Sequence, residues 1–260
     1  MTYNDATPKK EPSDLPTLVG VPCFSGAPWD LEHLAPLRSG PVQTMRLPEN
    51  LDSVDAYADG VAKEVENLDS YVLAGDSFGA VISLTLALRQ PEGLVGLVLS
   101  GGFAANPLPA WKGLAASLSR FAPGPLYRQG TLRFHAFQMA SKFDAAAEIP
   151  HKQKDFRKLF AENTPRRSYT ARVTSVTHFD VVSQLDRVTV PTLLITPAHD
   201  KLVGDAAAKQ MLDGIANARE VVLPGTGHMF RFTHPTLYAQ TIADFVAEIG
   251  SSSTRDPRSA

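Results

Sequence analysis

Short apolar runs alternate with segments of helical periodicity along the first hundred residues. Apolar runs bounded by turn residues predict buried strands, here at residues 17–24, 42–47, 71–74 and 94–99. Helical spacing of apolar positions predicts helices at residues 29–37 and 53–68, and residues 78–89, which are apolar nearly all round, predict a buried helix. Strands that are apolar at nearly every position suit a parallel sheet covered on both faces, so this pattern predicts an α/β fold.

The alternation stops after residue 102 and resumes near residue 186. Residues 103–185 predict helices but no clear strand, and the pattern then continues with strands at 188–196 and 220–223 and helices at 206–215 and 235–249. We therefore predict one core, made of residues 17–102 and 186–250, that is interrupted by a helical insertion at 103–185. Residues 1–16 and 251–260 are polar and are predicted to be flexible tails.

Composition narrows the class of protein. A chain of 260 residues that is 43% hydrophobic and carries a net charge of −2 is neither disordered nor collagen-like, and it does not suit a bulk nucleic-acid binder. Cys23 is the single cysteine, so no internal disulfide can form. Residues 1–16 lack the apolar run of a secretory signal, and glycine and proline interrupt residues 93–111. We expect a soluble cytoplasmic protein with no transmembrane segment and no nucleic-acid partner.

A candidate nucleophile lies in the sequence Gly75-Asp-Ser-Phe-Gly79, which fits the pattern G-x-S-x-G. The motif follows a predicted strand and begins a predicted helix. A turn this sharp needs glycine on both sides, and it exposes the Ser77 hydroxyl at the positive end of the helix. The alternative interpretation is a tight turn whose serine only caps the helix.

With this motif the chain resembles the α/β-hydrolase family over about residues 18–249. The resemblance implies an acid and a histidine that follow the serine in that order, each after a strand. Asp200 follows the strand at 188–196, and His228 follows the strand at 220–223. The implied roles are Ser77 as nucleophile, His228 as general base and Asp200 as the group that orients the imidazole. Each could instead be an ordinary loop residue, and the rival bases His199 and His234 are weaker candidates.

The resemblance also implies an oxyanion hole made of two backbone N–H groups. We expect these to be the amides of Phe78 and Phe24. The family usually has His-Gly in the loop that contains Phe24, whereas this chain has Pro22-Cys23. We expect the thiol to be buried and inert, with a nucleophilic thiol as the alternative. Family members often begin with a β-hairpin for which the proline-broken N-terminal segment leaves little room, so one or both of its strands are expected to be missing.

The insertion carries most of the positive charge. It contains twelve Lys and Arg and five acids, a surplus of seven positive charges, so the rest of the chain is strongly acidic. In the resembled family such an insertion forms a helical cap over the nucleophile, and we expect Cys23, Trp111 and Phe137 to line the substrate pocket. The basic charge is either a solvated surface or a docking site for an acidic carrier protein, as in pimeloyl-ester esterases, or for an anionic lipid surface.

These features predict a serine hydrolase that cleaves a carboxylic ester or thioester through an acyl-enzyme, with no cofactor and no metal. Ser77 argues against dehalogenase and epoxide hydrolase relatives, which have aspartate at this position. Hydrolysis of a carbon–carbon bond, aminopeptidase activity and acyl transfer would use the same three residues and remain alternatives. A non-catalytic ligand-binding protein of the same fold is the alternative from another class.

Overall fold

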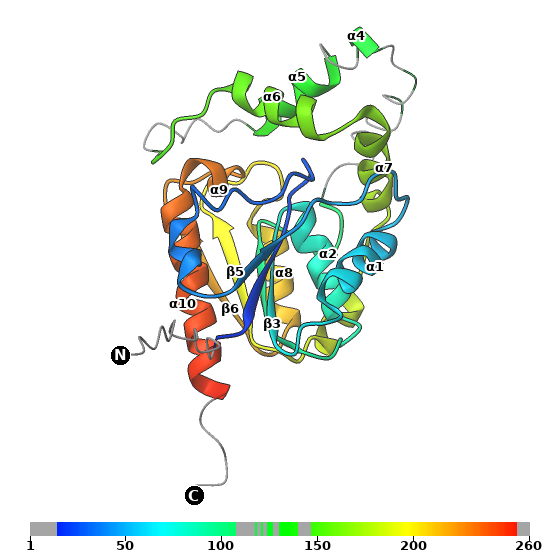
Figure 1. The fold of residues 1–260 in the computed structure, drawn as a ribbon. Helices are drawn as coiled ribbons and strands as arrows, with labels where there is room; N and C mark the ends of the chain where they lie inside the picture. The colour runs from blue at the N-terminus through cyan, green and yellow to red at the C-terminus, as the bar shows by residue number, and fades with distance from the viewer. Residues whose placement is uncertain are drawn as a thin grey trace, which may run out of the picture.

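The sheet has six strands, all parallel, in the order β2-β1-β3-β4-β5-β6 (Figure 1). It is seen in a computed structural model that describes residues 15–107, 118, 121, 124–126, 130–139 and 147–253. The strands are β1 (Thr17–Val21), β2 (Val42–Thr44), β3 (Tyr71–Asp76), β4 (Leu94–Ser100), β5 (Thr192–Pro197) and β6 (Ala218–Leu223). The predicted parallel α/β sheet is therefore confirmed.

Helices cover both faces of this sheet. One face packs against α1 (Val54–Val65), α2 (Phe78–Ala87) and α8 (Asp205–Gly214). The other face packs against η1 (Ala35–Ser39) and α10 (Pro235–Ser253). Alternate residues of β3 supply the two cores, with Tyr71 and Leu73 in the first and Val72 and Ala74 in the second. Burial of both faces explains why the strands are apolar throughout rather than alternating.

The register brings the carboxyl ends of the central strands to one edge. Asp76 at the end of β3 pairs with Ser100 of β4, and Ser100 pairs with Ile195 near the end of β5. Loops that follow β3, β5 and β6 therefore emerge side by side. Open parallel sheets hold their sites at this edge.

The segment between β4 and β5 is helical where it is described. It contains α4 (Gly124–Leu126), α5 (Leu132–Met139), α6 (Gln153–Asn163), α7 (Arg166–Val176) and η5 (Val182–Arg187). Figure 1 shows α5 and α6 above the carboxyl edge of the sheet, whereas α7 lies beside α1. Side chains from this segment form a third apolar cluster with Met229 from the core, so the segment is packed onto the site-bearing edge.

Several helices and strands differ from the sequence-based expectation. Residues 29–34, expected to be helical, form no helix but end in a turn at residues 31–34, and Pro36 at the start of η1 suits a helix beginning there. The strand predicted from Val188 begins only at Thr192, just after Pro191. The short helix α9 (Phe230–Thr233) was not predicted. Helix α10 continues to Ser253, where a flexible tail was expected from residue 251, and Ser251 Oγ donates to the Ala247 carbonyl within it.

The N-terminal hairpin that was expected to be reduced or missing would lie mostly in residues 1–14, which are outside the described part of the chain. Between residue 15 and β1 there is no strand. Among the described helices, none is both long and apolar enough to cross a lipid bilayer.

Candidate active site

Ser77 occupies a strained turn between β3 and α2. Its φ of 55° and ψ of −114° are unusual for a residue with a side chain, and such strain is a common feature of functional sites. The Ser77 N–H donates to the Ser100 carbonyl at 2.7 Å, which anchors the turn to β4. A Cβ at Gly75 would collide with the backbone of Gly79, so the tight turn requires glycine at this position.

Gly79 is constrained from outside the turn, and its replacement gives the first testable prediction. A Cβ here would collide with the carbonyl oxygens of Val21 and Pro22 at the end of β1. We expect Gly79→Ala to lower the free energy of unfolding by about 3 kcal/mol or more, because the backbones must separate. Urea denaturation of both proteins measures the change. Gly204→Ala is the control for a glycine with open space around it, although its φ of 77° adds local strain. A loss below about 1 kcal/mol for Gly79→Ala would contradict this packing argument.

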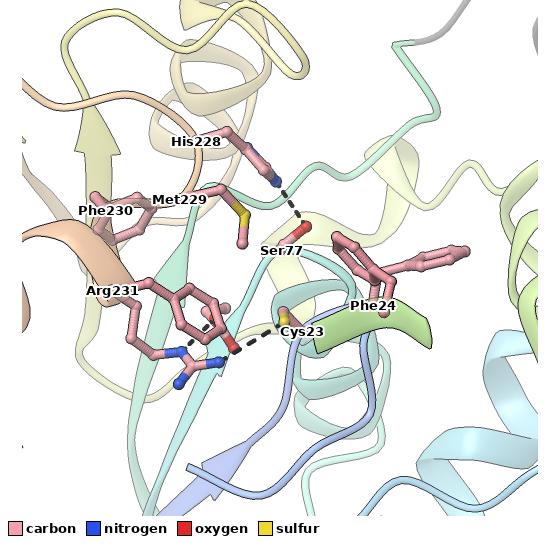
Figure 2. A pocket seen from close by; sticks show the side chains of 10 residues that line it. Cys23, Phe24, Ser77, His228, Met229, Phe230 and Arg231 are labelled. Carbon is pink, nitrogen blue, oxygen red and sulfur yellow. Dashed lines mark hydrogen bonds and ion pairs between the residues drawn. The ribbon is translucent and has the colours of Figure 1, made fainter. Parts of the chain in front are cut away.

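His228 and Asp200 meet Ser77 in a hydrogen-bonded row. His228 Nε2 lies 2.8 Å from Ser77 Oγ, and His228 Nδ1 lies 2.7 Å from Asp200 Oδ2. Figure 2 shows the imidazole of His228 pointing at the Ser77 hydroxyl. The other oxygen of Asp200, Oδ1, accepts hydrogen bonds from the backbone N–H groups of Leu202 and Val203, which fixes the carboxylate. The three residues that the sequence analysis proposed as a catalytic set are far apart in the sequence and meet in the structure.

Burial and charge act in opposite directions on this row. Burial alone would lower the pKa of His228, but the charge and hydrogen bond of Asp200 and the charge of Asp76 outweigh it, so the net pKa is raised above 6.5. Burial would raise the pKa of Asp200, whereas His228 and the two backbone donors lower it below 3.8. Asp200 is therefore ionised wherever His228 titrates.

The rival histidines do not join the row. His199 is exposed, and its backbone N–H donates to the Thr226 carbonyl. His234 is buried, and its Nδ1 lies 2.9 Å from the hydroxyl of Thr233. It precedes α10, as a helix-entry residue would.

The loop after β1 carries Phe24, one of the two expected oxyanion donors, and the other, Phe78, directly follows Ser77. The segment between β4 and β5 holds this loop: Arg172 of α7 donates to the Phe24 carbonyl at 2.7 Å, and Thr164 donates to the Ser25 carbonyl at 3.1 Å. Arg172 is only 1% exposed, so one of the twelve basic residues expected to make the insertion's surface basic is buried instead. The loop is shaped around it, since a Cβ at Gly26 would meet its guanidinium.

A small cavity adjoins Ser77 and has room for about one water molecule. Its lining is Cys23, Phe24, Asp76, Ser77, Phe160, His228, Met229, Phe230, Arg231 and Phe232. Cys23 was expected here. Phe137 was not confirmed as a pocket residue: it is 64% exposed on α5, whereas Leu132 and Ala136 of the same helix are buried in the third cluster. Trp111, the other predicted lining residue, lies outside the described residues.

The contribution of α9 to the cavity beside Ser77 was not predicted from the sequence. Phe230, Arg231 and Phe232 border the cavity, and all three follow His228 within four residues. Their closeness to His228 in the sequence was a usable signal, but a helix of four residues has no clear periodicity. No group of three or more His, Cys, Asp or Glu suited to a metal ion occurs in the described part of the chain.

Comparisons with known proteins agree with this architecture. The family model described as serine aminopeptidase, S33, matches residues 42–233. RutD of Variovorax paradoxus (strain S110), for which carbamate hydrolysis is the proposed activity, is 26% identical over 224 residues, covering 80% of this chain and 79% of RutD.

Two solved structures have the same fold. A hydrolase from Pseudomonas aeruginosa PA01 superposes with a TM-score of 0.78 at 19% identity, covering 90% of this chain and 91% of that one. The enol-lactonase from Burkholderia xenovorans LB400 superposes with a TM-score of 0.76 at 17% identity, covering 92% and 94%. The family model spans well over half of the chain, so this protein belongs to the serine aminopeptidase S33 family of α/β-hydrolases.

Proposed function

We propose that the chain is a serine hydrolase that cleaves a carboxylic ester, or a thioester, through an acyl-enzyme on Ser77. The observation that carries this proposal is the row in which Ser77 Oγ, His228 and Asp200 are joined by contacts of 2.8 and 2.7 Å at a strained strand-to-helix turn. A serine hydroxyl becomes nucleophilic when an oriented imidazole takes its proton.

The proposed reaction has two halves. Ser77 Oγ attacks the carbonyl carbon while its proton moves to His228 Nε2, and the backbone N–H groups of Phe24 and Phe78 receive the developing oxyanion. The tetrahedral intermediate collapses, the alcohol or thiol leaves with the proton of His228, and an acyl ester remains on Ser77. Water then gives a proton to His228 and attacks this ester, which releases the acid and returns the proton to Ser77.

The preference of the enzyme for an ester over an amide or a carbamate can be tested with a panel of chromogenic substrates. The cavity beside Ser77 has room for about one water molecule, so we expect fastest turnover for p-nitrophenyl esters of the shortest acyl chains. Matched p-nitroanilides and p-nitrophenyl carbamates are the comparison substrates, because relatives include aminopeptidases by family name and a proposed carbamate hydrolase. Faster cleavage of an anilide or a carbamate than of every ester would overturn the ester assignment.

The raised pKa of His228 predicts the pH dependence of the reaction. Only the neutral imidazole can accept the Ser77 proton, so kcat/KM is expected to rise with pH and to reach half its plateau above pH 6.5. Asp200, whose pKa is lowered, adds no further step in that range. Measuring kcat/KM with a small ester from about pH 5 to about pH 9 gives the midpoint. A midpoint below 6.5 would contradict the proposed environment of the imidazole.

Arg172 offers a test of how the loop with Phe24 is held. We expect Arg172→Met to lower kcat about 10- to 100-fold with a smaller effect on KM, because the loop loses its hydrogen bond to α7 while the substrate pocket keeps its apolar lining. Arg167→Met is the matched control, since Arg167 is exposed on the same helix. Equal kinetics for the two variants would show that Arg172 does not position the oxyanion donor.

A further inference from the structure

A buried cation lies beneath the Ser77–His228 pair, and the proposed reaction does not use it. Arg231 is fixed by its Nε, which donates to Asp76 Oδ2 at 2.6 Å, and both side chains are almost fully buried, 5% and 6% exposed. A terminal nitrogen of the same guanidinium lies 3.7 Å from the sulfur of Cys23. Figure 2 shows Arg231 reaching from α9 toward Cys23, below the contact between Ser77 and His228.

Cys23, Asp76 and Arg231 each lie within three residues of a group of the proposed active site. Cys23 directly precedes Phe24, and Asp76 directly precedes Ser77. Arg231 follows His228 by three residues and lies in α9. Each side chain therefore lies on one of the three chain segments that carry Phe24, Ser77 and His228. Their contacts join these three segments to one another in the buried interior.

Cys23 belongs to this linkage as a thiol rather than as a nucleophile. Burial raises the pKa of Cys23 and the charge of Asp76 raises it further, against weaker lowering by Arg231 and Ser25. The thiol is therefore protonated at neutral pH, and its sulfur lies 3.3 Å from the Ser25 hydroxyl. Glycine, usual at this position in the family, would have no side chain to reach Arg231.

Aromatic rings fix the guanidinium from the remaining sides. It lies 4.1 Å from the ring centre of Phe232 and 5.6 Å from that of Trp29. Burial would lower the pKa of Arg231, but the charge and hydrogen bond of Asp76 outweigh this effect, so the group remains a cation. A buried ion pair stabilises a fold only weakly, whereas removal of one partner leaves an unpaired charge in a site of low dielectric. The pair is therefore better explained by what it does to the adjacent groups.

We propose that Arg231, Asp76 and Cys23 form a positioning unit that fixes the chain segments of Phe24, Ser77 and His228 and sets the electrostatic potential at the imidazole. The unit rests on the proposed function, because it acts on the same nucleophile and base. The charged and titratable groups around His228 are Asp200 after β5, Asp76 at the end of β3, Arg231 in α9 and Cys23 after β1. Lys201, next to Asp200, is exposed.

Two variants separate the electrostatic part from the geometric part. Asp76→Asn keeps the shape but removes a negative charge that favours the imidazolium and leaves Arg231 unpaired. We expect the midpoint of kcat/KM against pH to fall by about 0.5 to 1 unit. Arg231→Lys keeps the charge but cannot bridge Asp76 and Cys23 with one planar group. We expect kcat about 10-fold lower or more, with KM within about twofold and an unchanged midpoint.

The experiment measures pH profiles of kcat and kcat/KM for the wild type, both variants and Asp213→Asn. Asp213 is the matched control, an exposed carboxylate paired with Lys209 on α8. The proposal would be overturned if the midpoint of kcat/KM against pH were unchanged in Asp76→Asn and kcat were unchanged in Arg231→Lys. If Asp76→Asn does not fold, the kcat and KM of Arg231→Lys decide whether the proposal holds. Values equal to those of the wild type would then contradict the proposal. Inactivity of the wild type toward every ester would instead count against the proposed function.

Discussion

Replacing Ser77 by alanine is expected to abolish ester hydrolysis, with kcat reduced by about 10⁵-fold or more. The alanine side chain retains the Cβ, so the turn and the packing of α2 stay intact while the only atom that forms the acyl-enzyme is lost. His228 Nε2 then has no hydroxyl at 2.8 Å from which to take a proton. The measurement is steady-state kinetics with a short-chain p-nitrophenyl ester.

The control for this variant lies on α2, the helix that follows Ser77. Ser83 is fully buried in α2 and lies outside the lining of the cavity. Ser83→Ala is therefore expected to keep wild-type kcat within about twofold, because it alters α2 without touching the reacting atoms. Retention of more than about one hundredth of the activity by Ser77→Ala would mean that another group carries the reaction.

Replacing Asp200 by asparagine is expected to reduce kcat by about 10³- to 10⁴-fold although the shape of the site is kept. The amide oxygen can still accept from the backbone N–H groups of Leu202 and Val203, so the amide NH₂ faces His228 Nδ1. An NH₂ donor selects the tautomer whose proton is on Nε2, and that nitrogen can no longer take the proton of Ser77. We therefore expect the variant to fold correctly but to hold His228 in the tautomer that cannot accept the Ser77 proton.

The same variant changes the pH dependence. Asp200 provides the largest effect that raises the pKa of His228, so its loss moves the midpoint of kcat/KM to lower pH. Asp205→Asn, at the exposed start of α8, is the control for loss of a nearby negative charge. A kcat for Asp200→Asn within tenfold of wild type would show that the carboxylate does not orient the imidazole.

Much of this arrangement could be predicted because local chemistry specifies it. The strands are apolar on both faces, and that pattern follows directly from burial between two helical layers. The turn at Ser77 requires glycine at positions 75 and 79 for steric reasons, which leaves a recognisable motif. Asp200 and His228 could be nominated because each follows a strand whose carboxyl end lies at the same edge.

Contacts between distant segments could not be predicted from such patterns. Arg172 has an ordinary place in a basic helical segment, and only the packing of α7 against the loop after β1 makes it buried. Phe137 was nominated for its aromatic side chain, but the rotation of α5 turns it to solvent. The pairing of Asp76 with Arg231 spans 155 residues, and neither residue has a sequence signature. Docking of an acidic carrier protein on the basic insertion remains a prediction.

Fluorophosphonate labelling shows whether Ser77 is an activated nucleophile. The phosphorus atom of the probe is attacked by an activated serine oxygen, and mass spectrometry of a digest identifies the modified residue. We expect one labelled serine at neutral pH, Ser77, with labelling lost in Ser77→Ala and strongly slowed in Asp200→Asn. A folded wild-type protein that resists the probe, or that carries the label on another residue, would show that Ser77 is not the activated nucleophile.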